Sequence, residues 1–339
     1  MCIIPGRTRI RGLAALIAAA FWAAGCSGGA VSETDPPTPI VLGFAQVGAE
    51  SGWRTASTKS IKESAAEYGI ELKFSDGQQK QENQITAIRG FIAQKVDVIA
   101  FSPIVETGWD NVLADCKDAG IPVVLLDRSV KLTEGGRLAD YYVSFIGSDF
   151  AEEGRRAAAF LTENARGFFP DRDVINVYEL EGTPGSAPTI DRKSSFDYAV
   201  SAAYNPKIQV VVSEPGNFTR AEGRQIVERW LADGARIDVL FSHNDDMALG
   251  AIKAFEAAGI EPGKDVMIIG VDGIRDALEA IAAGKMNCSI ECNPLLGPKL
   301  METAQKIAAG DQNIPKRVLS EEGVFTAENA EEALPLRKY

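Results

Sequence analysis

Along residues 40–335, apolar runs typical of β-strands alternate with stretches whose apolar residues recur at helical spacing. Ile40 to Val47 is a near-continuous apolar run, as expected of a parallel strand that is buried on both faces. The stretch that follows places Ile61, Ala65 and Tyr68 on one helical stripe and ends at Gly69. The same succession of strand and helix continues over residues 70–74, 85–92, 96–101, 109–119 and 121–126. This βαβαβαβ order predicts a parallel sheet with helices on both faces.

The pattern restarts after Asp140. Strands are expected at residues 142–146, 174–180, 208–212, 237–241 and 266–271. Helices are expected at residues 150–164, 189–203, 219–232, 246–258 and 274–283, and the tail adds a strand near Cys288, a helix over 295–309 and a strand near Val318. A chain of 339 residues exceeds the roughly 250–300 at which one core stops growing. We therefore expect an α/β fold of two doubly wound parallel-sheet lobes.

A faint internal repeat relates the two halves. The segment 96–102 (VDVIAFS) is similar to 237–242 (IDVLFS), and each is followed by a helix and a strand that ends in an acid, Asp127 or Asp272. Ligands of open parallel sheets bind beyond the carboxyl ends of the strands. Their matched positions favour the interpretation that Asp127 and Asp272 face one ligand from opposite walls of a cleft. The alternative is that each carboxylate merely caps a helix or binds a loop.

The N-terminus has the pattern of a targeting segment. Residues 1–25 carry three Arg and then a short apolar run, which is typical of a signal peptide and too short to span a membrane comfortably. Small residues before Cys26 resemble a bacterial lipobox, so we expect residues 1–25 to be a lipoprotein-type signal and Cys26 to carry the lipid. Ordinary secretion, with Cys26 incidental, is the alternative. Residues 26–39 are rich in Gly, Ser and Pro and are expected to form a flexible tether.

Charge and composition exclude several classes of function. The chain has 35 Lys and Arg against 47 Asp and Glu, a net charge of −12, which disfavours nucleic-acid binding. Its one histidine, His243, and the absence of zinc-type Cys and His spacing predict no metal site. No nucleophile elbow, phosphate loop or dinucleotide fingerprint is found, so we expect no catalytic residues and no cofactor. Cys116, Cys288 and Cys292 are expected to be buried free thiols.

Planar polar groups and aromatic rings follow the predicted strands. They are Trp53-Arg54, Asp127-Arg128, Asp191-Arg192, Phe218, Asn244 and Asp272. Carboxylate, amide and guanidinium groups make paired hydrogen bonds to adjacent hydroxyls, and an aromatic ring covers an apolar C–H face. This combination is typical of a site for a neutral sugar.

The same stretches resemble a known family. They are residues 43–54 (GFAQVGAESGWR), 76–85 (DGQQKQENQI), 107–109 (TGW), 125–129 (LLDRS), 190–193 (IDRK) and 243–247 (HNDDM). Over about residues 40–335 the chain is similar to the ribose/galactose class of type I periplasmic binding proteins, the sugar receptors of ABC importers. Within that class it is most similar to galactofuranose-binding receptors.

The resemblance implies three hinge crossovers, near Gly147, Cys292 and Leu319. The N-terminal lobe would comprise residues 40–147 and 293–318, and the C-terminal lobe residues 148–292 and 319–339. The ligand-binding residues would be Ser51, Trp53, Arg54, Asp127, Arg128, Arg192, Phe218, Asn244, Asp272 and Glu291. Glu291, or a near neighbour, would come from a hinge strand. The spacing from Pro294 to Gly297 after this strand is one residue shorter than the resemblance to the enterobacterial receptor predicts.

The implied function is binding followed by closure. A monosaccharide, galactofuranose or a related pentose or hexose, would contact both walls only when the lobes close, and the closed monomer would dock on ABC permease subunits outside the cytoplasm. The membrane would be reached only through the lipid anchor. Two alternatives stay open: a sugar sensor that presents its ligand to a chemoreceptor or sensor kinase, and a carbohydrate-acting enzyme that uses Asp127 and Asp272.

Overall fold

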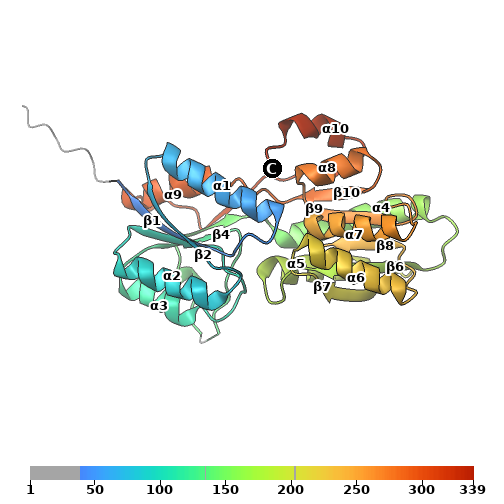
Figure 1. The fold of residues 1–339 in the computed structure, drawn as a ribbon. Coiled ribbons are helices and arrows are strands. Elements are labelled where there is room, and N and C mark those ends of the chain that lie inside the picture. The colour runs from blue at the N-terminus through green and yellow to red at the C-terminus, as the bar shows by residue number, and fades with distance from the viewer. Residues whose placement is uncertain (1–38, 134, 202–203) are drawn as a thin grey trace, which may run out of the picture. The chain divides into compact units, whose positions relative to one another are not determined.

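Two six-stranded sheets form the body of the computed structural model, which describes residues 39–133, 135–201 and 204–339 (Figure 1). The first sheet has the order β11-β5-β4-β3-β1-β2, with β1 (Val41–Gln46), β2 (Glu71–Asp76), β3 (Val98–Phe101), β4 (Val123–Leu126), β5 (Ser144–Gly147) and β11 (Arg317–Leu319). The second has the order β12-β10-β9-β8-β6-β7, with β6 (Ile175–Glu181), β7 (Ile208–Pro215), β8 (Val239–Ser242), β9 (Met267–Asp272), β10 (Cys288–Glu291) and β12 (Val324–Thr326). The strand orders correspond position by position, so the internal repeat extends over both sheets.

Helices accompany each sheet, and together they make the two lobes. The first lobe consists of the first sheet with α1 (Gly52–Glu67), α2 (Gln81–Ala93), α3 (Asp110–Asp118) and α9 (Gly297–Ala308). The second lobe consists of the second sheet with α4 (Phe150–Phe168), α5 (Ala187–Val200), α6 (Arg220–Ala232), α7 (Asp245–Ala257), α8 (Arg275–Ala282) and α10 (Ala330–Ala333). The predicted doubly wound α/β architecture is confirmed.

The first sheet separates two hydrophobic cores. In β1, Leu42 and Phe44 pack toward α1 and α9, whereas Ala45 packs with Phe101 and Trp109 on the opposite side. Successive strand residues point to opposite faces, so a strand with helices on both sides must be apolar at almost every position. The uninterrupted apolar run in the sequence therefore has a direct structural cause.

The chain passes between the sheets three times, after β5, after β10 and after β11. Every neighbouring pair of strands is parallel except β10 and β12. The chain leaves the carboxyl edge of the first sheet at Leu319 and enters the second sheet at Val324. Because β12 runs antiparallel to β10, the chain enters β12 at the carboxyl edge of the second sheet. The carboxyl ends of both sheets thus border the same region.

Several details of the sequence-based prediction differ from the structure. The repeat pattern places the strand predicted at 142–146 in the second round, whereas β5 pairs with β4 in the first sheet, as the lobe boundary at residue 147 implies. The prediction missed β12 and α10, which are three and four residues long and carry too few apolar positions to show a period. The predicted signal peptide, Cys26 and all but the last residue of the tether lie outside the described residues.

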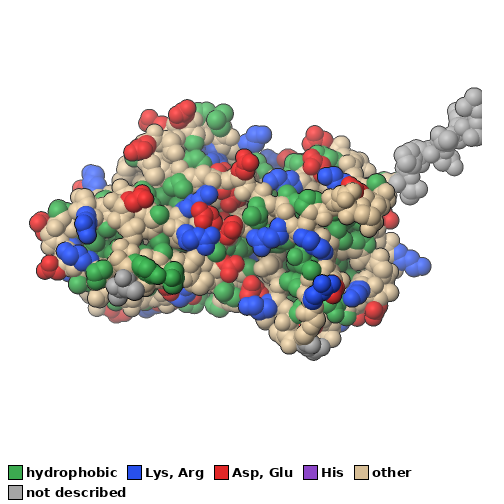
Figure 2. Space-filling model, turned by 180° about the vertical axis from the view of Figure 1, so that it is seen from behind, with side chains coloured by type: hydrophobic (Ala, Val, Ile, Leu, Met, Phe, Trp, Pro, Cys, Tyr) green, Lys and Arg blue, Asp and Glu red, His purple; other side chains and the backbone are tan. Residues whose placement is uncertain are grey.

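One face of the described part of the chain carries charged side chains of both signs. Figure 2 shows basic and acidic side chains interspersed over one face, with hydrophobic side chains scattered between them. Among the described residues, no helix is long and apolar enough to cross a membrane. The three described cysteines are free and buried, as predicted from their number and spacing.

Candidate functional site

A small cavity lies where the two lobes meet at the carboxyl ends of their strands. The lining combines acids, arginines, an amide and aromatic rings from both lobes. The lining residues are Glu50, Ser51, Trp53, Arg54, Asp127, Arg128, Phe150, Pro188, Arg192, Phe218, Asn244, Asp272 and Cys292.

Asp127 and Asp272 occupy equivalent places in the two lobes. Asp127 directly follows β4, and Asp272 is the last residue of its counterpart, β9. Both have positive φ, +64° and +123°, a region that non-glycine residues seldom adopt. This backbone turns each carboxylate off the end of its strand, and both side chains are almost fully buried. The prediction that the pair faces one cleft agrees with this geometry.

A network of four charged side chains forms the wall of the first lobe. Arg54 Nη1 lies 2.8 Å from Asp127 Oδ2, and Arg54 Nε donates to Glu50 Oε1 at 3.1 Å. Arg128 Nη1 donates to the Ile104 carbonyl oxygen at 3.2 Å. Three atoms of the network, Glu50 Oε2, Asp127 Oδ2 and Arg128 Nε, are buried without a hydrogen-bond partner, although Asp127 Oδ2 forms an ion pair with Arg54. Since orphaned buried polar groups are costly, these atoms indicate a polar ligand.

The charged groups of this wall shift one another's pKa values. Burial raises the pKa of Glu50, but the positive charges of Arg54 and Arg128 outweigh it, so the pKa lies below its ordinary value. Burial, together with repulsion from Arg54, lowers the pKa of Arg128 to about 10. At neutral pH the wall therefore holds a carboxylate and two guanidinium groups, which accept from and donate to hydroxyls respectively.

Arg192 and Asn244 form the wall of the second lobe. Arg192 extends from α5, its Nε donating to Glu153 Oε2 at 2.6 Å and its Nη1 to the His243 carbonyl oxygen at 2.5 Å. Asn244 caps α7, where its Oδ1 accepts from the Met247 amide at 3.0 Å. These bonds hold the two polar groups rigidly, as recognition of a small ligand requires.

His243 lies behind this wall rather than in the cavity. Its Nε2 is 2.8 Å from Glu179 Oε1, and its side chain is fully buried. This agrees with the expectation that a lone histidine here packs or supports other residues.

Aromatic rings close two sides of the cavity. The Trp53 indole Nε1 donates to the Cys292 carbonyl oxygen at 2.6 Å, which fixes the ring between the first lobe and the second crossover. The Phe218 ring lies 5.3 Å from the Arg128 guanidinium of the opposite lobe. A Cβ on Gly182 would lie 1.9 Å from the Phe218 ring, so only glycine lets this ring sit where it does. Flat apolar rings opposite charged hydrogen-bonding groups match the two faces of a sugar.

Nine of the ten sequence-predicted ligand residues line the cavity, and Glu291 does not. Glu291 Oε1 accepts from Arg337 Nη1 at 2.7 Å, and Glu291 Oε2 accepts from the Gly323 amide at 2.9 Å, so its carboxylate is held by the C-terminal segment. The neighbouring Cys292 lines the cavity instead. The sequence reading missed Glu50, Phe150, Pro188 and Cys292, although Glu50 lies in a motif it singled out, ESGWR.

Comparison with known proteins places this geometry in a family. Residues 42–312 match the periplasmic binding protein domain. The chain is 38% identical over 312 residues to the galactofuranose-binding protein YtfQ of Escherichia coli, covering 91% of this chain and 95% of that protein.

Two solved structures are similar throughout. A Mycobacterium smegmatis protein in complex with β-D-fucofuranose is 50% identical, with a TM-score of 0.82 and coverage of 87% of this chain and 94% of that one. The periplasmic binding component of an arabinose ABC transporter of Shewanella sp. ANA-3, bound to α- and β-L-arabinofuranose, is 41% identical, with a TM-score of 0.81 and coverage of 88% and 96%. The Escherichia coli and Shewanella relatives are binding proteins, in agreement with the sequence. The match over most of the chain and the cavity between two doubly wound lobes show that the protein belongs to the periplasmic binding protein family.

Proposed function

We propose that this protein is an extracytoplasmic receptor that binds a monosaccharide in its furanose form and delivers it to an ABC importer. The observation that carries the proposal is the cavity between the lobes, with Glu50, Asp127 and Arg128 on one wall and Arg192 and Asn244 on the other. The furanose preference draws on two similar solved structures, one of which holds β-D-fucofuranose and the other α- and β-L-arabinofuranose.

The cavity chemistry fits a neutral sugar. Carboxylate oxygens accept hydrogen bonds from hydroxyls, and guanidinium groups donate to them, so one hydroxyl satisfies two neighbouring protein groups. Glu50 Oε2 and Arg128 Nε, which have no hydrogen-bond partner, provide one acceptor and one donor on the same wall. Trp53 and Phe218 supply the apolar surface for the C–H face of the ring.

Closure of the lobes couples binding to delivery. The Glu106 amide of the first lobe donates to the Gly185 carbonyl oxygen of the second at 2.8 Å, and Arg128 lies against Phe218. A sugar that contacts both walls has its full affinity only when these contacts are made, so it shifts the population toward the closed state. The closed state is the form proposed to dock on the permease.

Several further features belong to the same proposal. Cys26 would carry a lipid after removal of residues 1–25, and residues 26–39 would tether a monomeric receptor to the membrane. The lobes would comprise residues 40–147 with 293–318 and residues 148–292 with 319–339. Ser51 and Asp272 complete the proposed ligand set, while Glu291 is left out.

A pair of locked sugars tests the proposal. Calorimetry of the purified protein is expected to show binding of 1,4-anhydro-D-galactitol, which is fixed as a five-membered ring, and of L-arabinose. The six-membered isomer 1,5-anhydro-D-galactitol is expected to bind at least tenfold more weakly. Binding of the two isomers with equal affinity would refute the furanose preference. No binding and no thermal shift with any sugar of a broad panel would refute the receptor function itself.

A further inference from the structure

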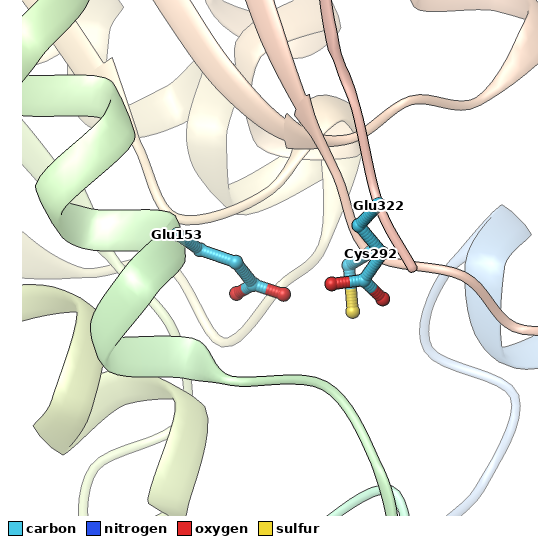
Figure 3. Close-up of side chains that lie close together, drawn as sticks. All are labelled: Glu153, Cys292 and Glu322. Carbon is cyan, nitrogen blue, oxygen red and sulfur yellow. The ribbon is translucent and has the colours of Figure 1, made fainter. Parts of the chain in front are cut away.

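Glu153, Cys292 and Glu322 converge at the crossovers, outside the charged network of the cavity (Figure 3). Glu153 comes from the first turn of α4, Cys292 follows β10, and Glu322 lies between β11 and β12. One carboxylate oxygen of each acid and the Cys292 Sγ all lie within 4.8 Å of one another. The three segments are far apart in sequence, so this cluster is produced by the tertiary structure alone.

Glu153 has an unsatisfied oxygen that faces the cluster. Glu153 is 1% exposed, and its Oε2 accepts a hydrogen bond from Arg192 Nε at 2.6 Å. Its Oε1 is buried without any hydrogen-bond partner. Figure 3 shows the Glu153 carboxylate extending from α4 toward Cys292 and Glu322. A buried carboxylate oxygen without a donor is costly and indicates a missing positive partner.

The charge around the cluster is also unbalanced. Arg192 forms an ion pair with Glu153, and among the described residues no other Lys or Arg forms an ion pair with any of the three side chains. One buried and one half-buried carboxyl group beside a thiol are the environment that a divalent cation would neutralise.

The donor set selects among cations. One sulfur and two carboxylate oxygens suit a tetrahedral Zn²⁺ site, whose fourth position a water or a hydroxyl can fill. Ser148 Oγ is near, at 3.4 Å from Cys292 Sγ and 2.5 Å from Glu322 Oε1. Ca²⁺ needs six to eight oxygen ligands and Mg²⁺ an octahedral oxygen shell, neither of which this cluster offers. Glu322 is only half-buried and leaves a route of entry from solvent.

We propose that Glu153, Cys292 and Glu322 form a Zn²⁺-type binding site at the crossovers. On binding, the Cys292 S–H bond breaks, its proton passes to the buffer, and a sulfur–metal bond forms without any change of oxidation state. The ion would link α4 to the second and third crossovers. The site adjoins the proposed sugar cavity, because Cys292 lines that cavity and Glu153 holds Arg192.

Metal titration of tag-free, chelator-treated full-length protein tests the site. Calorimetry with Zn²⁺ is expected to show one binding site in the wild type. Cys292→Ser and Glu322→Gln are each expected to lower the Zn²⁺ affinity of this site at least tenfold. Glu321→Gln, an exposed carboxylate next to the cluster, is the matched control and is expected to leave binding unchanged. Cys2 and Cys26 are present in every variant, so their contribution cancels. Co²⁺ is expected to give a thiolate charge-transfer band that Cys292→Ser abolishes.

The outcomes separate clearly. Absence of Zn²⁺ binding by the wild type overturns the proposal, as does Zn²⁺ binding that persists unchanged in both variants. Glu153→Gln serves as a further variant, because the glutamine keeps one oxygen for Arg192 and removes the charge. Circular dichroism and thermal melting of each variant confirm that a lost signal reflects a lost ligand and not unfolding.

Discussion

The amide of Gly52 donates a 2.7 Å hydrogen bond to Asp246 Oδ2, joining the N-terminus of α1 in the first lobe to the first turn of α7 in the second. The other oxygen of this carboxylate, Oδ1, accepts from Arg220 Nε at 2.9 Å. Asp246 is thus held in place by its own lobe while it reaches across to the other. The bond exists only when the lobes are together, so it contributes to closure and not to the stability of either lobe.

Substitution of Asp246 is expected to weaken sugar binding without any change in the cavity wall. Asp246→Ala removes a hydrogen bond to a charged group, worth about 1.5–3 kcal/mol, and is predicted to lower the affinity roughly tenfold or more. Stopped-flow measurements should show the change mainly as faster release. Asp276→Ala is the control, because Asp276 pairs with the same Arg220 but does not bond Gly52. Equal effects of the two variants would contradict the role in closure.

Trp53 is predicted to contribute through its ring and through its indole nitrogen. Trp53→Ala is expected to weaken binding by about 1–3 kcal/mol, because stacking and buried area are lost. Trp53→Phe keeps a ring but loses the bond to the Cys292 carbonyl oxygen, so an intermediate loss is expected. Calorimetry of both variants measures the two contributions, and unchanged affinity in Trp53→Ala would remove this residue from the site.

Asp127 is predicted to matter more than Trp53. Asp127→Ala leaves the buried Arg54 guanidinium without one of its two carboxylate partners and removes an acceptor from the ligand. Uncompensated buried charge is expensive, so the loss of affinity should exceed that of Trp53→Ala. Asp115→Ala is the control, since Asp115 forms an exposed ion pair with Arg89 and lies outside the cavity lining. A calorimetric effect of Asp127→Ala no larger than that of the control would refute the assignment.

Asp245 is predicted to make stability depend on pH. Burial raises its pKa from 3.8 to about 7, because the carboxylate is enclosed beside Asp246. The folded state therefore keeps a proton that the unfolded chain releases. Its contribution to the free energy of unfolding is fully present below the unfolded pKa and is lost as the pH rises through about 7.

The difference between wild type and Asp245→Asn isolates this contribution. The asparagine stays neutral, so urea unfolding between about pH 4 and about pH 8 is expected to show a smaller decline in stability with rising pH than the wild type. Asp265→Asn, an exposed acid in the same lobe, should keep the wild-type slope. Parallel curves for wild type and Asp245→Asn would show that Asp245 ionises normally.

Part of the site was accessible from the sequence because parallel sheets constrain where strands end. The internal repeat identifies Asp127 and Asp272 as acids at the ends of equivalent strands, and both side chains line the cavity. Glu291 followed the same logic, since it ends β10, but its side chain is drawn away by Arg337 from the C-terminal segment. No local pattern reports that interaction, because the two residues are 46 positions apart.

The sequence by itself determined the alternation of strand and helix, the two-lobed α/β class and the polar and aromatic residues that follow the strands. These features are local, since apolar period and residue type at a strand end depend on which faces each element must bury. Tertiary structure alone decided that β12 runs antiparallel, that Cys292 replaces Glu291 at the cavity, and that Glu153, Cys292 and Glu322 meet at the crossovers. These depend on contacts between distant segments, whose geometry is set only when both sheets are packed and the chain has crossed between them.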